Sequence, residues 1–186
     1  MKTFPLQLTL VFVLIVNLIA CSNSENDPID LCEHTTCQNG GECQNGICDC
    51  AEGYMGAYCE TERQPMTVTI NKIVVKQFPN PDEAPDIYIK LLRQEGDNFI
   101  DVYESDTYFE DATSPGSYLF TLETALNILH NDQPHIIAVF DYNWPNEDEL
   151  IGYSAFYPYE IGESFPEIKT VSVGDVVADV YLSYNW

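Results

Sequence analysis

Basic side chains are scarce in this sequence. Of its 186 residues only 7 are Lys or Arg, whereas 30 are Asp or Glu, and the formal net charge is −23. A field of this sign repels phosphate backbones, and no basic stripe overrides it, so we expect no nucleic-acid partner. Hydrophobic residues nevertheless make up 45% of the chain, which is ordinary for a folded protein. The acidity therefore belongs to the surface of a protein with a real core.

Motifs that carry catalysis are lacking as well. The chain contains no G-x-S-x-G elbow, no H-E-x-x-H pair, no phosphate-binding loop and no dinucleotide fingerprint. Its three histidines are dispersed: His34 lies in a cysteine-rich segment, His130 follows a short helical pattern and His135 opens a predicted strand. A hydrolase needs a nucleophile, a base and an orienting acid close together. We therefore expect that the protein is not an enzyme.

The long apolar run of this chain lies at its N-terminus. It extends from Leu6 to Ile19 behind the single basic residue Lys2 and is short for a membrane span, so residues 1–20 are predicted to be a signal peptide. The sequence Leu-Ile-Ala-Cys that ends at Cys21 resembles the lipobox of bacterial lipoproteins. That resemblance implies that Cys21 is acylated, becomes the first mature residue and is held at a membrane by its lipid. The alternative is an ordinary secretory signal with a chance cysteine nearby.

Residues 21–31 are polar and acidic, and they are predicted to form a solvated tether. Acidic residues soon after the anchor cysteine resemble the surface-export signal of Bacteroidetes lipoproteins. That resemblance implies a cell-envelope protein, attached to the outer membrane and exposed on the cell surface. A plain spacer on the periplasmic face would look the same.

The six remaining cysteines all lie in residues 32–59, with four, five, four, one and eight residues between them. A segment this short and poor in apolar residues cannot fold on a hydrophobic core alone, and in an oxidising compartment disulfides supply the missing stability. Zinc would be the alternative partner of so many cysteines, but paired C-x-x-C spacing is absent. The spacing by itself still allows fifteen pairings.

The end of this segment, Cys48-Asp49-Cys50 through Cys59, matches the signature C-x-C-x-x-G-Y-x-G-x-x-C without a gap. Residues 32–59 therefore resemble an EGF-like domain. The resemblance implies three disulfides, Cys32 with Cys43, Cys37 with Cys48, and Cys50 with Cys59. Two glycines of the signature, Gly53 and Gly56, are expected at turn positions with positive φ or no room for a side chain, and Tyr54 is expected to cover the disulfide core.

After a linker at residues 60–65, the pattern of residues 66–186 is that of strands. Apolar residues alternate with polar ones in short runs closed by turn residues, which predicts an all-β fold with an eight-stranded antiparallel β-sandwich. A short helix is expected at Leu122–His130. The predicted strands are Thr67–Lys76, Ile87–Leu92, Phe99–Tyr103, Tyr118–Leu122, His135–Phe140, Ile151–Phe156, Ile168–Val173 and Val177–Tyr184.

Parts of this second domain resemble the C2 domain, the calcium- and lipid-binding sandwich of protein kinase C and synaptotagmin. Residues 85–90 (PDIYIK) look like the S-D-P-Y-V-K of its second strand, and residues 139–143 (VFDYN), followed by 149–152 (ELIG), look like V-x-D-x-D and D-x-I-G. The resemblance implies a calcium site, because calcium prefers six to eight oxygen ligands from convergent loops. The implied ligands are Asp82, Asp86, Asp141, Asn143, Asp148 and Glu149.

This sequence departs from the C2 pattern in its acidic loops. The first-loop aspartate of the family falls on Asn80, so Asp82 is a displaced substitute, and Asn143 replaces an aspartate that Asp148 would compensate. Solvated acidic loops without an ion are the alternative. A basic patch for docking on anionic membranes is missing, so membrane attachment rests on the N-terminal lipid.

Exposed aromatic residues are the remaining candidates for a binding surface. Trp144 lies between the implied calcium ligands, where it would either insert into a partner or cover its loop. The other aromatics are core or edge packing, or a face for sugars or peptides. They are Tyr153, Phe156, Tyr157, Tyr159 and Phe165.

Together these features predict a non-enzymatic, lipid-anchored envelope or cell-surface protein that binds a protein or a glycan, with calcium as an aid. The EGF-like unit would serve as a rigid spacer or a second contact. A purely structural envelope lipoprotein without a soluble ligand, or an accessory subunit of a glycan-uptake system, would have the same sequence features.

Overall fold

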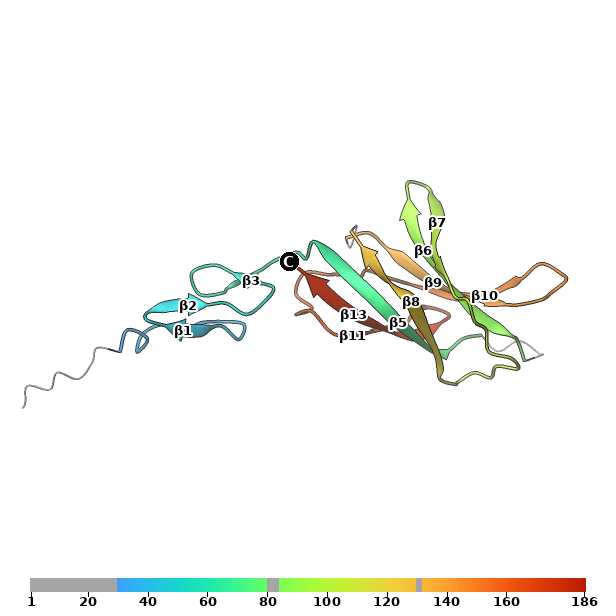
Figure 1. The fold of residues 1–186 in the computed structure, drawn as a ribbon, viewed down its shortest axis with the longest axis horizontal. Coiled ribbons are helices and arrows are strands. Elements are labelled where there is room, and N and C mark those ends of the chain that lie inside the picture. Colours follow the sequence, from blue (N-terminus) through green and yellow to red (C-terminus); the bar gives the residue numbers. More distant parts are fainter. Residues whose placement is uncertain (1–29, 80–83, 130–131) are drawn as a thin grey trace, which may run out of the picture.

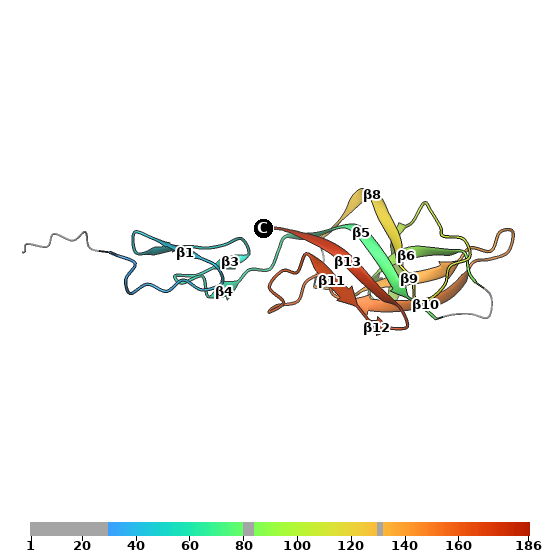
Figure 2. The same ribbon diagram turned by 90° about the horizontal axis from the view of Figure 1, so that it is seen from below.

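The computed structural model describes residues 30–79, 84–129 and 132–186. Cys21, Asp82 and His130, the signal peptide and most of the tether lie outside the described residues. A slender disulfide-bonded module is followed by a sandwich of two sheets, as Figure 1 and Figure 2 show. All regular structure in these three ranges is strand, and they contain no helix that could cross a membrane.

The N-terminal module consists of two short antiparallel hairpins. The first pairs β1 (Glu42–Gln44) with β2 (Ile47–Asp49), and the second pairs β3 (Tyr54–Met55) with β4 (Thr61–Glu62). The strand β4 lies inside the segment that the sequence suggested as a linker. The module therefore continues to Glu62.

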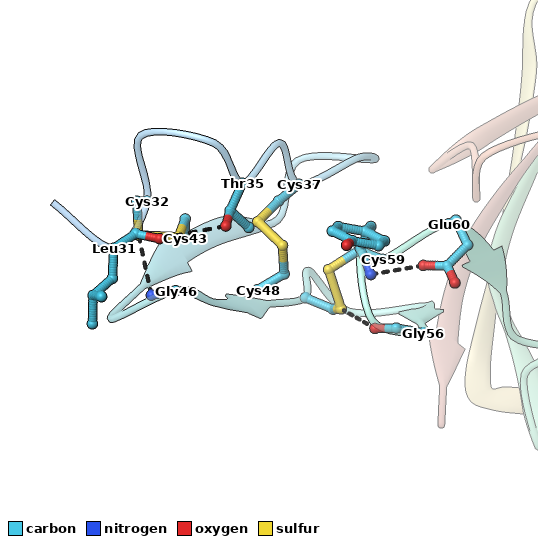
Figure 3. Close-up of a disulfide and its surroundings, with 12 residues drawn as sticks. Leu31, Cys32, Thr35, Cys37, Cys43, Gly46, Cys48, Gly56, Cys59 and Glu60 are labelled. Carbon is cyan, nitrogen blue, oxygen red and sulfur yellow. Dashed lines mark hydrogen bonds between the residues drawn. A yellow bond between two sulfur atoms is a disulfide. The ribbon is translucent and has the colours of Figure 1, made fainter.

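Three disulfides hold the module together: Cys32–Cys43, Cys37–Cys48 and Cys50–Cys59, the pairs that the EGF-like resemblance implies. Figure 3 shows all three bridges within this small unit. Cys59 is fully buried. A Cβ at Gly41 would lie 2.6 Å from the Cys59 sulfur. The bridges thus take the place of a hydrophobic core, and a glycine is required beside one of them.

The sandwich contains nine strands within the described residues, and all their pairings are antiparallel. One sheet has the order β12-β10-β9-β6-β7, and the other has the order β11-β13-β5-β8. The strands are β5 (Thr67–Gln77), β6 (Ile87–Glu95), β7 (Asn98–Glu104), β8 (Tyr118–Ile128), β9 (His135–Asp141), β10 (Glu149–Phe156), β11 (Ile168–Val171), β12 (Val173–Gly174) and β13 (Val177–Asn185).

The core lies between the two sheets and follows the alternation of the strands. On β5 the fully buried residues are Val68 and Ile70, then Ile73 and Val75. The step of three residues from Ile70 to Ile73 corresponds to a bulge at Asn71, which is skipped in the register with both neighbouring strands. Because a strand has a period of two, this one extra residue restores the core-facing phase.

Two predicted elements differ from the structure. The helix expected at Leu122–His130 is wrong, because β8 continues as a strand to Ile128 and pairs there with Val68 of β5. Leu122 and Leu126 are four residues apart, so they would share one face of a helix and also one face of a strand. Pairing with β5 makes this segment a strand. The predicted strand Ile168–Val173 is divided into β11 and β12, which belong to different sheets.

Specific polar contacts join the module to the sandwich. The Glu62 carboxylate accepts hydrogen bonds from the Tyr159 hydroxyl (3.1 Å) and from the backbone N–H of Gly162 (3.0 Å). Burial and the hydrogen bond to Glu62 raise the pKa of Tyr159 to about 12. Next to Glu62, the N–H of Arg63 donates to the Gly53 carbonyl (2.8 Å) and so fixes the module's last strand.

Aromatic packing completes this contact, which we call the joint: Gly53, Tyr54 and Glu62 of the module against Tyr159, Phe165 and Trp186 of the sandwich. Tyr54, expected to cover the disulfide core, lies edge-on against Phe165, with ring centroids 5.5 Å apart. Gly53 is buried with φ of 87°, and a Cβ there would lie 2.3 Å from the Phe165 ring. The signature Gly-Tyr pair is therefore used to dock one module on the other.

Candidate binding surfaces

The implied calcium ligands lie at the end of the sandwich where β9 and β10 meet. Asp141 ends β9 opposite Glu149, which begins β10, and Asn143 and Asp148 lie in the loop between them. Asp86 immediately precedes β6, whose first residue is paired with Asp141. The structure thus brings five of the six implied residues to one end of the sandwich, and Asp82 lies outside the described residues.

Their carboxylates already accept hydrogen bonds from the protein. Asp141 Oδ1 accepts from the N–H of Asp86 (2.8 Å), and Asp86 Oδ1 accepts from the N–H of Asp111 (3.0 Å). Asp148 accepts from the N–H of Asn143 (3.0 Å) and from the Tyr88 hydroxyl (2.8 Å). Within residues 30–79, 84–129 and 132–186, three or more candidate ligands are nowhere gathered closely enough to hold a metal. In the described residues these carboxylates hold the loops at this end of the sandwich to one another and to β6.

These hydrogen bonds shift the pKa values of Asp148 and Tyr88. The backbone N–H of Asn143, and next the Tyr88 hydroxyl, lower the pKa of Asp148. Burial, with the same hydrogen bond and the charge of Asp148, raises the pKa of Tyr88 well above its ordinary value. Both shifts favour the pairing of a charged carboxylate with a neutral phenol, so Asp148 fastens its loop to β6.

A different surface of the sandwich is hollowed and apolar. It is a groove of about 540 Å³ on the solvent-facing side of the five-stranded sheet. Its residues come from β6, β7, β9, β10 and the turn before β9. They are Leu92, Gln94, Phe99, Pro134, Ile136, Ala138, Phe140, Leu150, Tyr153 and Ala155.

The groove arises because β9 is apolar on both sides. Its residues Ile137 and Val139 are fully buried in the core, whereas Ile136, Ala138 and Phe140 line the groove on the opposite face. An antiparallel sheet with one face in water normally alternates apolar and polar residues. The unbroken apolar run from Ile136 to Phe140 is therefore the sequence signal for this surface, but by itself it indicates only a strand.

Acidic residues are frequent in the segments that line the groove. Exposed carboxylates within two residues of a lining residue in the chain are Glu95, Asp97, Asp101, Asp132 and Glu149, and Asp101 lies opposite Leu92 of the groove in the strand register. The nearby cations are neutralised: Lys90 pairs with Glu104 (2.8 Å) and Asp101 (3.4 Å), and Arg93 pairs with Glu95 (3.7 Å). The hydrogen bond to Glu104 and the charges of both acids raise the pKa of Lys90. The groove thus has an apolar floor, and the chain segments that form it carry an excess of carboxylates.

The aromatic residues singled out in the sequence separate into different roles. Tyr153 lines the groove and is 46% exposed, whereas Phe156 and Tyr159 are buried and Phe165 belongs to the joint. Tyr157 is exposed outside the groove. Aromatic sequence content therefore did not distinguish binding residues from core residues.

Trp144 is 80% exposed in the loop that joins β9 to β10. This loop lies at the end of the sandwich opposite the module (Figure 1). The loop directly follows β9, the strand that carries Phe140 of the groove.

The two described histidines lie in different parts of the chain. His135 is buried at the start of β9, and its Nδ1 lies 3.0 Å from the Gln133 carbonyl oxygen. His34 lies in the disulfide-bonded module, far along the chain from the groove.

No family model matches this chain. EGF-like domain-containing protein 2 of Lottia gigantea is 27% identical over 114 residues, which cover 59% of this chain and 21% of that protein. The chain therefore spans about a fifth of that relative's length. The relative supports an EGF-like module in this chain.

Several solved structures are similar to most of this chain. BON1-C2B covers 63% of this chain and 89% of its own length, at 11% identity and a TM-score of 0.44. The match with a C2 domain of plant extended synaptotagmin 1 covers 67% of this chain and 99% of that domain, at 12% identity and a TM-score of 0.37. The match with human GIVD cytosolic phospholipase A2 covers 64% of this chain and 17% of that protein, at 14% identity and a TM-score of 0.41. The first two are C2 domains by name, and we transfer no ligand or site residue from any of the three.

Proposed function

We propose that this chain is an exported, lipid-anchored binding protein without catalytic activity, which docks a partner protein in the apolar groove of its five-stranded sheet. The observation that carries the proposal is the apolar floor on a solvent-facing sheet of a chain with a formal net charge of −23. Contiguous apolar surface with a polar rim is typical of protein interaction sites.

The chemistry of the groove selects the occupant. Its floor is lined by aliphatic and aromatic residues, with Gln94 as the one amide among them, so it offers few hydrogen bonds to the hydroxyl groups of a glycan. The chain has a formal net charge of −23 and the segments that form the groove carry an excess of carboxylates, so we propose a partner that presents apolar side chains within a basic surface. A second copy of this chain fits less well, because it carries the same large negative charge.

Lipid anchoring rests on the cysteines. Six of the seven are joined in three disulfides, which leaves Cys21, at the end of the lipobox-like sequence, as the cysteine outside these bridges. Acylation would modify the sulfur of Cys21, and we propose that the lipid then anchors the protein in the outer membrane of a cell envelope, facing the cell surface. Mass spectrometry of the protein extracted from membranes tests this: the expected N-terminal fragment begins with a diacylated or triacylated Cys21, and a free thiol there would contradict it.

Calcium is not included in this proposal, because Asp86, Asp141 and Asp148 accept hydrogen bonds from the protein and no cluster of three candidate ligands is found among the described residues. The alternative, a structural envelope lipoprotein without a soluble ligand, does not explain why an apolar groove faces solvent.

Display selection tests the groove directly. Random peptides are selected on the purified protein and on a Leu150→Asp variant, with Leu119→Asp as the matched control. Both leucines are 49% exposed, but Leu119 lies on β8 of the other sheet. We expect enriched peptides to combine apolar residues with Lys or Arg, to bind Leu119→Asp normally and to lose binding to Leu150→Asp.

Salt and oligomeric state complete the test. Binding of the selected peptides should weaken as ionic strength rises, because salt screens the attraction between basic peptides and this acidic protein. Enrichment of peptides without basic residues, or equal binding to both leucine variants, would contradict the proposal. Concentration-dependent dimerisation abolished by Leu150→Asp would show instead that a second copy occupies the groove.

A further inference from the structure

A second hollow lies beside the joint, and its chemistry differs from that of the groove. It has a volume of about 560 Å³ and is walled by Glu52 of the module together with residues of β5, β13 and the C-terminal Trp186. Small-molecule sites are found preferentially at such domain interfaces. We call it the junction pocket.

The bulge on β5 shapes one wall of this pocket. Asn71 has no register partner on either β13 or β8, and its side chain is exposed at the pocket. Bulges re-aim side chains away from the regular pleat. Ser183, exposed on β13, adds a hydroxyl to the same pocket. The amide and the hydroxyl together offer both donors and acceptors.

Lys72 provides a cation without a matching anion in contact. Its ammonium lies 3.8 Å from the centroid of the Tyr181 ring, and both residues line the pocket. Among the described residues, the ion pairs within 4 Å involve Lys76, Lys90, Arg93 and Lys169 and do not include Lys72. In a chain with 30 acidic residues this is a cation held by an aromatic ring and directed at the pocket.

Aromatic surface and acidic groups complete the lining. Trp186 packs edge-on against Phe165, with centroids 4.5 Å apart, and remains partly exposed to the pocket. The exposed carboxylates of Glu52 and Glu167 lie on the walls. The pocket therefore contains an aromatic platform, an amide, a hydroxyl and charges of both signs.

We propose that the junction pocket binds a neutral oligosaccharide. Aromatic rings pack against the C–H faces of a sugar, while amide, hydroxyl, ammonium and carboxylate groups exchange hydrogen bonds with its hydroxyls. A strongly anionic ligand would meet Glu52 and Glu167, and an apolar ligand would leave the polar groups of the pocket without partners. The site is separate from the apolar groove and does not depend on the partner proposed there.

Fluorescence of Trp186 gives a direct measurement of occupancy. The chain has two tryptophans, so Trp144→Phe leaves Trp186 as the single reporter in the full-length protein. Neutral and acidic glycans on an immobilised array identify a neutral probe, which is then titrated in solution. We expect saturable binding of neutral glycans, accompanied by a change in Trp186 emission.

Variants of β5 separate the pocket from the rest of the sheet. We expect Asn71→Ala and Lys72→Met each to weaken binding of that probe about tenfold or more, which corresponds to about 1.4 kcal/mol. The control Lys76→Met removes a lysine of the same strand that pairs with Asp179 outside the pocket, and should leave affinity unchanged. Unchanged melting temperatures of the pocket variants show that the fold is intact.

Three results would overturn this proposal. The first is that the protein binds no neutral glycan on the array, and the second is that it binds acidic glycans alone. The third is that Asn71→Ala, Lys72→Met and the control bind the probe with equal affinity. The groove variant Leu150→Asp should bind the glycan normally, so failure of the groove proposal and failure of the pocket proposal give different data.

Discussion

Gly53→Ala is expected to release the module from the sandwich without unfolding either part. Gly53 is buried in the joint with φ of 87°, and a methyl group there would lie 2.3 Å from Phe165 and 2.8 Å from Trp186. Real Cβ atoms essentially never approach so closely, so one of the two surfaces must withdraw. Withdrawal separates Tyr54 from Phe165 and stretches the two hydrogen bonds of Glu62.

The cost follows from these contacts. The aromatic pair contributes about 0.5–1.5 kcal/mol, and hydrogen bonds to a charged group contribute about 1.5–3 kcal/mol each when well sheltered. Since Glu62 is only half-buried, we expect docking to weaken by about 2–4 kcal/mol, which is about 30- to 1000-fold. Gly40→Ala is the matched control, because Gly40 lies in the same module with φ of 76° and the nearest neighbour of its added methyl is 3.9 Å away. Both variants share a left-handed backbone cost of about 1–2 kcal/mol.

Nitrogen-15 relaxation measures the outcome. In the unchanged protein and in Gly40→Ala, amides of the module and of the sandwich should report one common rotational correlation time. In Gly53→Ala the small module should tumble faster than the sandwich, while its three disulfides and chemical-shift dispersion persist. If Gly53→Ala keeps a common correlation time, or if Gly40→Ala loses it equally, the aromatic clash does not control docking.

Three further predictions concern the end of the sandwich that carries Trp144. Thermal melts in EDTA and in millimolar calcium should coincide, because the carboxylates of Asp86, Asp141 and Asp148 already accept protein hydrogen bonds; a higher melting temperature in calcium would show that these loops rearrange around the ion. The lowered pKa of Asp148 means that its contribution to stability is present above the ordinary value of 3.8 and is lost as pH falls through the lowered value. The melting temperature of Asp148→Asn should thus lie below that of the unchanged protein at neutral pH and converge with it in strong acid, and a constant difference would contradict this. Trp144→Ala should leave the melting temperature within about 1 °C because the side chain is 80% exposed, but should weaken capture of groove-binding peptides; unchanged capture would make Trp144 a cover of its own loop.

The alternating pattern of the sequence was enough to predict a sandwich, because the period of two records which residues face the core. Val68, Ile70, Ile73 and Val75 could be placed on one strand, and the strand signals at His135–Phe140 and Val177–Tyr184 correspond to β9 and β13. The extension of β8 through Leu126 could not be predicted, since its residues suit a helix locally and pairing with a strand more than 50 residues away decides the outcome.

The candidate sites were less accessible to sequence reasoning. Acidic loops could be read from the residues, but the identity of the donors that satisfy Asp141 and Asp148 depends on three-dimensional proximity to Asp86 and Tyr88. The groove and the junction pocket combine residues from several strands, and a sequence without long-range contacts does not reveal such combinations. The role of Gly53 was only half visible: its positive φ could be expected from the signature, but its aromatic neighbours could not.

The way the chain enters the sandwich determines how the protein would bear tension. The N–H of Met66, directly before β5, donates to the carbonyl of Asn185 at the end of β13 (2.7 Å). Once the joint has given way, a pull delivered from a membrane anchor would enter through this residue and load β5 along its length, between β13 and β8. Hydrogen bonds of an antiparallel sheet stand across the strand, so many of them would be sheared together and none could be peeled off singly. The load between a membrane anchor and a bound partner would thus pass through a strand that is hydrogen-bonded on both edges.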